Sequence, residues 1–194
     1  MANMEQIKAL RERTGAGIVE VKKALETAGG DEEGAIRILR ESGAAKAIKK
    51  TGREAKEGVI SSYLHSNGRI GSMVKLYCET DFVARNGEFQ SLGRDIAMQV
   101  AAMNPTALRP EDVSDETVGK ETEIWTEQLR QEGKPEAMME KILAGKEKKF
   151  REERALLSQS FVKDPSKTIQ DIVTENVQKM GENIQVGEFS RFEI

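Results

Sequence analysis

Two side chains of the 194-residue sequence have the chemistry of a nucleophilic dyad. His65 is the single histidine and Cys78 the single cysteine, and both fall on adjacent stretches with the pattern of one hairpin. A thiol–imidazole pair would need a third group to orient the base and donors to hold an oxyanion. No such groups are recognisable nearby. A half-buried structural cysteine is the simpler interpretation, and a thiol enzyme is the least favoured function.

Other reaction centres are not indicated either. One cysteine cannot form an intramolecular disulfide or a cysteine-based zinc site. Carboxylates such as Glu147 have basic residues three or four positions away, as on solvated helix faces. Neither a phosphate-binding loop nor the glycine-rich dinucleotide fingerprint is present. We expect no catalytic residue, no metal site and no cofactor, and therefore a protein that is not an enzyme.

Composition is that of a folded protein outside the membrane. Hydrophobic residues make up 38% and charged residues 32% of the chain, with 17 Gly and 4 Pro. No apolar run approaches the ~20 residues of a transmembrane helix, and the N-terminus lacks the pattern of a secretory signal. A cytoplasmic location is expected. The net charge of −3 gives no general attraction to nucleic acid.

Basic residues gather before a change of composition near residue 55, where we place the boundary between domains 1–54 and 55–194. A solvated basic linker helix is the simpler interpretation. Contact with RNA is the alternative, but the stretch has no stacking aromatic, and phosphate contacts alone are weak and sensitive to salt. The basic residues are Lys46, Lys49, Lys50, Arg53 and Lys56.

Residues 1–54 are expected to contain three short helices. Gly15 and Gly17 mark the first turn, Gly29-Gly30 ends the second helix, and Asp31 caps the third. One small core of about 40 residues suits a binding module better than an enzyme. The apolar residues at helical spacing are Ile7, Leu10, Ile18, Val21, Leu25, Ala28, Ile36 and Leu39.

Residues 55–194 are expected to form an α+β core. Apolar residues on both sides of Asn67-Gly68 predict an antiparallel hairpin, and Phe82 falls at the corner between its second strand and an amphipathic helix ending at Asn104-Pro105. Further helices are predicted at about 114–131, 135–153 and 168–180. A last strand, 184–192, is expected to close the sheet.

Specific segments of this sequence closely resemble the elongation factor Ts family in its short bacterial or organellar form. The resemblance covers essentially the whole chain. It implies a guanine-nucleotide exchange factor for elongation factor Tu, with a three-helix ubiquitin-associated-like module followed by an antiparallel-sheet-plus-helices dimerisation core. The segments are Leu10–Gly17, Val21–Leu25, Cys78–Asn86, Glu140–Lys146 and Gln159–Asp164.

The resemblance also implies which residues contact the partner. In the family, a Thr-Asp-Phe-Val corner, here Thr80, Asp81, Phe82 and Val83, reaches the G domain of elongation factor Tu. Phe82 would wedge between helices near the bound Mg²⁺ and displace that ion. Two alternatives remain open: Phe82 is an ordinary core aromatic, or Asp81 serves only as the cap of the following helix.

The N-terminal module of the family packs on the same partner, which points to Arg11, Gly15, Ile18 and Val19. Helical spacing puts Ile18 on the buried stripe of the second helix, together with Val21 and Leu25. Val19 lies off that stripe, and an exposed valine there suits a docking surface. A valine exposed without any such role is the alternative.

Tyr63 and His65 resemble a motif that longer members carry in a second half-core. Here this motif and the corner share one short core, which suggests a homodimer in a 2:2 complex with elongation factor Tu. Each partner would then meet Asp81 and Phe82 of one protomer and Tyr63 and His65 of the other. An ordinary surface histidine is the alternative for His65.

Two other function classes remain open. A free-standing module of the ubiquitin-associated kind, or a helper of nascent chains, would use residues 1–45 but leave the corner without a role. An RNA-binding translation protein would use the basic linker, and it predicts a strong, salt-dependent affinity for RNA. The exchange factor needs neither direct nucleic-acid binding nor a membrane, and it uses the corner as well.

Overall fold

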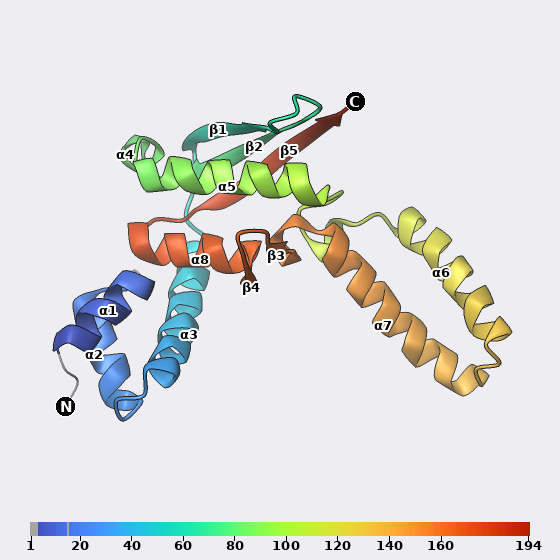
Figure 1. The fold of residues 1–194 in the computed structure, drawn as a ribbon, viewed down its shortest axis with the longest axis horizontal. Coiled ribbons are helices and arrows are strands. Elements are labelled where there is room, and N and C mark those ends of the chain that lie inside the picture. The colour runs from blue at the N-terminus through green and yellow to red at the C-terminus, as the bar shows by residue number, and fades with distance from the viewer. Residues whose placement is uncertain (1–3, 15) are drawn as a thin grey trace. The chain divides into compact units, whose positions relative to one another are not determined.

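The computed structural model describes residues 4–14 and 16–194, and it confirms the expected α+β class (Figure 1). The principal strands are β1 (Glu57–Leu64), β2 (Ile70–Cys78) and β5 (Gln185–Glu193). The helices are α1 (Met4–Thr14), α2 (Ile18–Thr27), α3 (Glu32–Lys50), α4 (Asp81–Ala84), α5 (Gly87–Met103), α6 (Asp115–Gln131), α7 (Glu136–Arg154) and α8 (Ile169–Met180).

The chain folds into two compact units. The first comprises residues 1–61, 75–94 and 171–187, and the second comprises residues 62–74, 95–170 and 188–194. The three long strands and α5 contribute residues to both units. The exposed corner and the N-terminal helices therefore belong to the first unit, and the hairpin turn belongs to the second.

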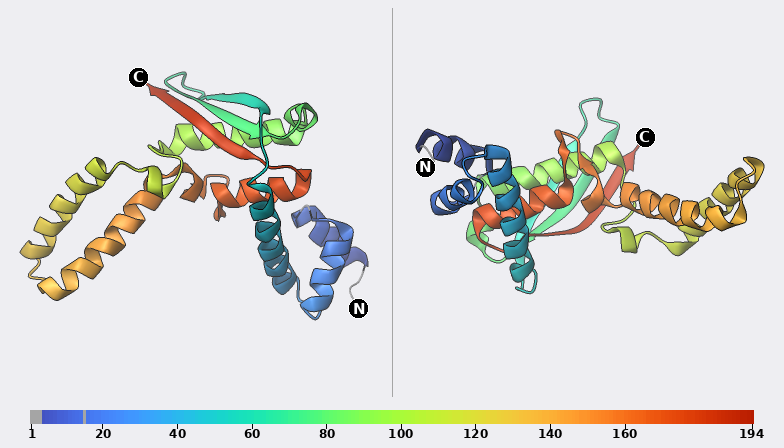
Figure 2. Two further views of the ribbon diagram at one scale, coloured as in Figure 1. Left: turned by 180° about the vertical axis from the view of Figure 1, so that it is seen from behind. Right: turned by 90° about the horizontal axis from the view of Figure 1, so that it is seen from below.

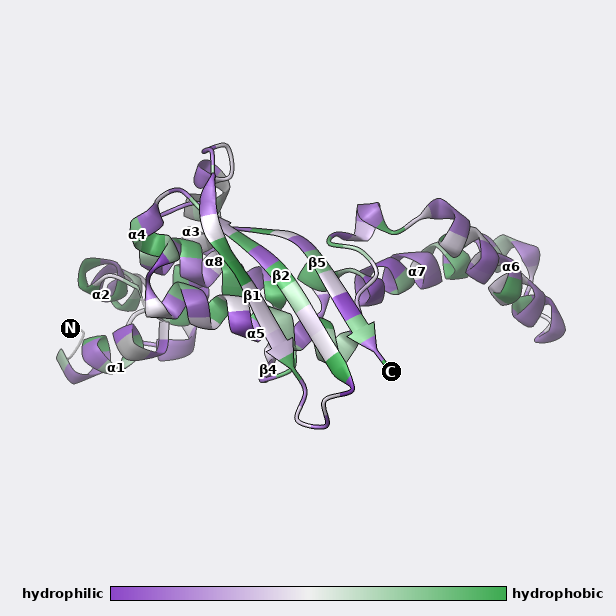
Figure 3. Cartoon of the chain, turned by 90° about the horizontal axis from the view of Figure 1, so that it is seen from above, coloured by the Kyte–Doolittle hydropathy of each residue, from purple (hydrophilic) through white to green (hydrophobic). Residues whose placement is uncertain are grey.

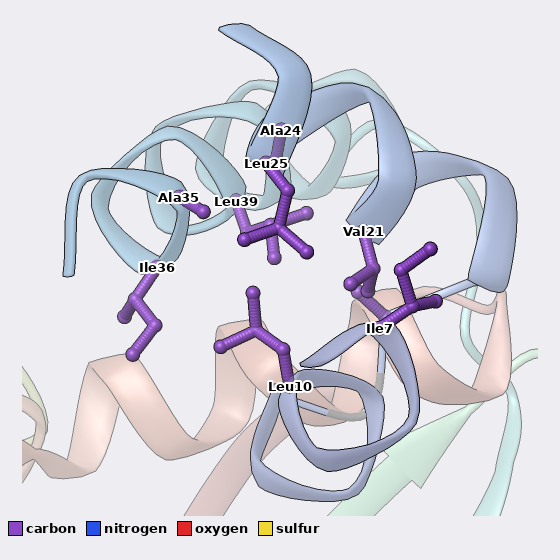
Figure 4. Packing of buried hydrophobic residues seen from close by; sticks show 9 residues of the cluster. Ile7, Leu10, Val21, Ala24, Leu25, Ala35, Ile36 and Leu39 are labelled. Carbon is purple, nitrogen blue, oxygen red and sulfur yellow. The ribbon is translucent and has the colours of Figure 1, made fainter. Parts of the chain in front are cut away.

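Three helices form a small core at the start of the first unit. Side chains of α1, α2 and α3 converge there (Figure 4), and Gly29 and Gly30, with φ of +65° and +91°, end the second helix. Asp31 accepts a hydrogen bond from the Gly34 amide at 2.9 Å, which confirms the predicted cap. The buried residues are Ile7, Leu10, Ala16, Val21, Ala24, Leu25, Ala35, Ile36 and Leu39.

The placement of Ile18 in this core was wrong. Its side chain is 53% exposed, whereas Val21 and Leu25 are fully buried. Helical spacing does align Ile18 with Val21, but Ile18 is the first residue of α2. The small core thus covers the apolar stripe of α2 from Val21 onward but does not reach Ile18 at the start of the helix.

The basic linker is helical only as far as Lys50, so the expected linker helix was wrong beyond that residue. Turns and extended chain connect Lys50 to β1, because Gly52 is a poor helix former and the backbone must enter a strand. Among the described side chains, those of Lys49, Arg53 and Lys56 are exposed. The Lys46 side chain lies outside the described part.

The three-stranded antiparallel sheet has the order β1-β2-β5, which confirms both the hairpin and its closure by the last strand (Figure 1). At the hairpin turn the His65 amide donates to the Ile70 carbonyl at 2.8 Å, and Gly68 has a φ of +68°. In β2 the side chains of Val74 and Leu76 are buried, whereas that of Met73 is exposed. The face of β2 that carries Val74 and Leu76 is therefore packed, and Met73 on the other face is open to solvent.

Helix α5 packs on the buried face of the sheet (Figures 1 and 2). In the second unit the Ser72 hydroxyl donates to the Ala97 carbonyl at 2.6 Å. In the first unit, Gly93 lies so close to Ser61 that a β-carbon would collide with its side chain. Figure 3 looks onto the opposite face, where the strands lie in front of α5.

Helices α6 and α7 form an antiparallel pair in the second unit (Figure 2). They begin and end within one residue of the predicted spans, although Pro135 is the N-cap of α7 and not part of its first turn. Arg151 of α7 joins the pair because its guanidinium donates to Asp115 of α6 at 2.6 Å, and it also donates to Glu147 of its own helix at 2.9 Å. Trp125 and Phe150 pack edge to face at 5.6 Å between ring centroids.

A second, two-stranded sheet was not predicted. Strand β3 (Ser160–Phe161) pairs antiparallel with β4 (Asp164–Thr168) just before α8. A two-residue strand is too short to show an alternating pattern, and Pro165 argues against a strand because it lacks a backbone donor. Short 3₁₀ turns at Pro110–Asp112 and Leu156–Ser158 were also not predicted.

Candidate functional site

The chain turns sharply where β2 ends, and Thr80 fixes that turn. Its backbone is extended, with φ −128° and ψ 155°, and its hydroxyl accepts a hydrogen bond from the Val83 amide at 3.4 Å. Thr80 is thus the N-cap of α4. The alternative in which Asp81 is the cap was wrong, because Asp81 lies in the first turn and pairs with Arg85 at 3.0 Å.

Phe82 projects from this one-turn helix. Its side chain is 82% exposed, while Ala84, two residues later, is buried. Successive helical residues point about 100° apart, so the turn that buries Ala84 directs Phe82 outward. The alternative that Phe82 is a core aromatic was wrong, and the corner presents an apolar ring to its surroundings.

Two carboxylates, those of Glu182 and Glu79, fix the backbone of the corner. The Glu182 carboxylate accepts hydrogen bonds from the amides of Glu79 and Thr80, at 3.0 and 3.1 Å, and from the Thr80 hydroxyl at 2.6 Å. The Glu79 carboxylate accepts a hydrogen bond from the Asn183 amide at 2.6 Å. Each of the two segments, residues 79–80 and residues 182–183, therefore supplies a carboxylate that accepts hydrogen bonds from the other.

The same network includes the linker that follows α3. The buried Asn183 side chain donates to the Arg53 carbonyl at 2.7 Å, and the Arg53 guanidinium lies 3.5 Å from the Glu79 carboxylate. The anchoring roles of Glu79, Glu182 and Asn183 were not predicted from the sequence. The available signal was weak, because polar residues after Gly181 are also typical of a solvated loop.

Cys78 is a core residue and not a nucleophile. It is fully buried at the end of β2, more completely than expected, and its thiol donates to the Thr80 carbonyl at 3.2 Å. Burial, followed by the negative charge of Glu182, raises the pKa of Cys78 to about 11. His65 follows the end of β1, so the two residues occupy opposite ends of the antiparallel hairpin.

Tyr63 and His65 lie side by side in the second unit. They are two positions apart on one strand and its extension, so their side chains share a face. The Tyr63 hydroxyl is 3.2 Å from Nδ1 of His65, and the ring centroids are 6.2 Å apart. His65 is exposed and Tyr63 half-buried. The pair therefore places a phenol hydroxyl and an imidazole near the hairpin turn.

The N-terminal module presents a second apolar surface within the first unit. Val19 is 79% exposed, as predicted, and Ile18 beside it is largely exposed too. Arg11 is also exposed. Gly15, the fourth predicted residue of this surface, lies outside the described residues. The start of α2 therefore carries two neighbouring aliphatic side chains facing solvent.

Other kinds of site are absent from the described residues. No group of three or more His, Cys, Asp or Glu side chains that could hold a metal ion is present there. No helix in the same part of the chain is long and apolar enough to span a lipid bilayer. The exposed corner and the start of α2 remain as the main candidate surfaces.

The described residues define an α+β protein that displays apolar side chains at a fixed corner and on a three-helix module. The family model described as Elongation factor TS matches residues 19–194. The chain is 54% identical over 190 residues to elongation factor Ts of Thermodesulfovibrio yellowstonii, which covers 98% of this chain and 94% of the relative.

Two further relatives agree over nearly their whole length. Elongation factor Ts of Thermosipho melanesiensis is 53% identical over 194 residues, covering 100% of this chain and 99% of the relative. That of Syntrophomonas wolfei is 50% identical over 194 residues, covering 100% and 91%. The chain belongs to the elongation factor Ts family, whose members are translation elongation factors in protein biosynthesis.

Proposed function

We propose that this protein is a guanine-nucleotide exchange factor that binds elongation factor Tu in its GDP-bound and nucleotide-free states. The observation that carries the proposal is the exposed Phe82 on a turn fixed by Thr80 and Glu182, in a chain of this family. Thr80, Asp81, Phe82 and Val83 form the surface that contacts the G domain. Docking there dislodges the bound Mg²⁺ and opens the nucleotide site.

An aromatic wedge suits this task for physical reasons. A phenylalanine ring supplies a large apolar area on a side chain with only two torsions, so it loses little entropy when it is immobilised. Held between two helices of a partner, it keeps open a gap that would otherwise close over the nucleotide. Removal of Mg²⁺ leaves the phosphate charges of GDP without a main counter-ion, which weakens GDP binding.

Exchange of this kind needs no covalent step. A factor that binds the nucleotide-free partner more tightly than the GDP-bound partner weakens GDP binding by the same free energy, because the linkage is reciprocal. A coupling of ~4 kcal/mol, if it appears fully in the dissociation rate, accelerates release about a thousandfold. GTP excess in the cell then sets the direction, and the protein is not an enzyme.

The N-terminal module supplies a second contact with the same partner. Arg11, Ile18 and Val19, with the glycine turn that includes Gly15, form this docking surface. Two exposed aliphatic side chains at the start of α2 support this role. We propose that residues 1–54, the ubiquitin-associated-like module with its basic linker, act as one domain and residues 55–194 as the core and dimerisation domain.

We further propose that the protein acts in the cytoplasm as a homodimer, in a 2:2 complex with elongation factor Tu. Exposed apolar side chains at the hairpin end of the sheet support this. Leu64 and Met73 project from one face of the β1–β2 hairpin, and Phe192 and Ile194 are exposed near the end of β5. Such side chains become buried when two copies pair about a two-fold axis.

The dimer proposal can be tested by subunit mixing. Each partner contacts Phe82 of one protomer and His65 of the other, so Phe82→Ala and His65→Ala chains, co-refolded, produce mixed dimers with one intact site each. Exchange activity is expected to rise above that of either variant alone. A monomer in sedimentation, or mixtures no more active than their components, would contradict the dimer.

The exchange function itself is tested with fluorescent GDP. The purified protein is added to elongation factor Tu loaded with the labelled nucleotide, and an excess of unlabelled GDP prevents rebinding. We expect release to accelerate in proportion to the protein added until the partner is saturated. A release rate unchanged at every concentration would contradict the proposed function.

A further inference from the structure

We propose that Glu182 is a positioning residue for Phe82, acting with Glu79 as a clamp between residues 79–80 and 182–183. The inference rests on the proposed function, because it concerns the orientation of the wedge. Neither glutamate needs to touch the partner. Their task is to hold the backbone before α4 in one conformation.

The geometry favours a positioning role because the bonds converge on the residues that start α4. Glu182 accepts from two consecutive amides, those of Glu79 and Thr80, and from the Thr80 hydroxyl. That hydroxyl also caps the helix by accepting from the Val83 amide. One carboxylate thus fixes both the backbone and the cap from which Phe82 projects.

A one-turn helix needs such external support. Four residues are too few to form a stable helix alone, and Phe82 contributes almost no packing to its own subunit. Hydrogen bonds to a charged acceptor are stronger than those between neutral groups. The orientation of the ring therefore depends on the clamp more than on the core.

The clamp also connects the corner to the linker after α3. The backbone amide of Asn183 donates a hydrogen bond to the Glu79 carboxylate, and its side-chain amide donates one to the Arg53 carbonyl. The linker and the corner are thus held by adjacent residues of one loop. Movement of that loop would disturb both, and Glu182 is the member that contacts Thr80 directly.

A double-mutant cycle tests the proposal through the rate of GDP release. We expect Glu182→Ala to slow stimulated release by about tenfold, because a ring held in the wrong orientation loses much of the rate that the ring contributes. If Glu182 acts through Phe82, the Glu182→Ala, Phe82→Ala double variant releases GDP as slowly as Phe82→Ala alone. Amide hydrogen exchange at residues 79 and 80 is expected to accelerate in Glu182→Ala.

Glu88→Ala is the matched control. It removes a carboxylate of the same unit that pairs with Lys179 of α8 at 2.7 Å and has no role in the clamp. It is expected to leave stimulated release unchanged. If Glu182→Ala does not fold, Glu182→Gln enters the same cycle, because it keeps the shape and removes the charge.

Two results would contradict the positioning role of Glu182 and leave the proposed exchange function unaffected. Glu182 variants as active as the wild type, when Phe82→Ala is slow, would remove Glu182 from the mechanism. Losses that multiply in the double variant would show that Glu182 acts independently of Phe82. Failure of the wild-type protein to accelerate release would instead contradict the exchange function.

Discussion

Two phenylalanines seven positions apart have opposite surroundings. Phe89, in the first turn of α5, is fully buried, whereas Phe82 on α4 is 82% exposed. Phe89 is held by packing, which fixes a side chain by close contact on all sides. Phe82 is placed by hydrogen bonds to the backbone beneath it, which leaves its ring free to contact another molecule.

The difference shows how a short protein can present an apolar ring without losing order. Burial of an aromatic side chain stabilises the fold but removes the ring from use. A polar clamp between distant segments fixes the backbone and needs no contact with the ring. Residues that determine stability are therefore distinct from residues that determine exchange, and the following variants test that distinction.

The largest stability effect is expected at Phe89. Truncation in Phe89→Ala leaves a cavity in a packed core and is predicted to lower the free energy of unfolding by about 3–5 kcal/mol. The matched Phe82→Ala change is expected to shift it by less than about 0.5 kcal/mol, as at other exposed sites. Urea unfolding of both variants measures the contrast, and equal losses would refute it.

A smaller effect is expected from alkaline pH at Cys78. Because its pKa is raised from 9.0 to about 11, the unfolded chain loses the thiol proton first as pH rises. Stability from the protonated thiol is fully present below pH 9 and is lost between pH 9 and 11, by about 2–3 kcal/mol at ~1.4 kcal/mol per unit. Unfolding measured against Cys78→Ala, which lacks this group, isolates the effect. Identical pH profiles would contradict it.

The smallest of these effects is expected at Thr80. Thr80→Ala removes the N-cap hydroxyl and one bond to Glu182, and loss of such a cap typically costs about 1 kcal/mol. Thr80→Ser retains the hydroxyl and is expected to behave like the wild type in thermal unfolding. A serine variant as unstable as the alanine variant would assign the effect to the lost methyl group instead.

Local sequence signals predicted most of the elements. Asn67-Gly68 indicated the hairpin because this pair adopts the required positive φ readily, and apolar spacing indicated the long helices. Phe82 was recognised from its flanking residues, and the structure adds that its ring is exposed. These features depend on residues that are close together in the chain, so they can be predicted from the local sequence.

Contacts between distant segments could not be predicted in the same way. Glu182 and Thr80 are separated by 102 positions, and no pattern near either residue indicates the partner. The exposure of Ile18 depends on where a small core ends, which helical spacing does not specify. The end of α3 at Lys50 reflects the entry into β1 as much as local propensity.

GDP release stimulated by wild type and by Phe82→Ala, with and without Mg²⁺, tests the central claim most directly. With Mg²⁺ present we expect the variant to be at least about tenfold slower, a barrier difference of ~1.4 kcal/mol. After chelation of Mg²⁺ the difference is expected to shrink, because the ion no longer has to be displaced. Equal release rates for the two proteins in Mg²⁺ would contradict the claim that Phe82 drives exchange.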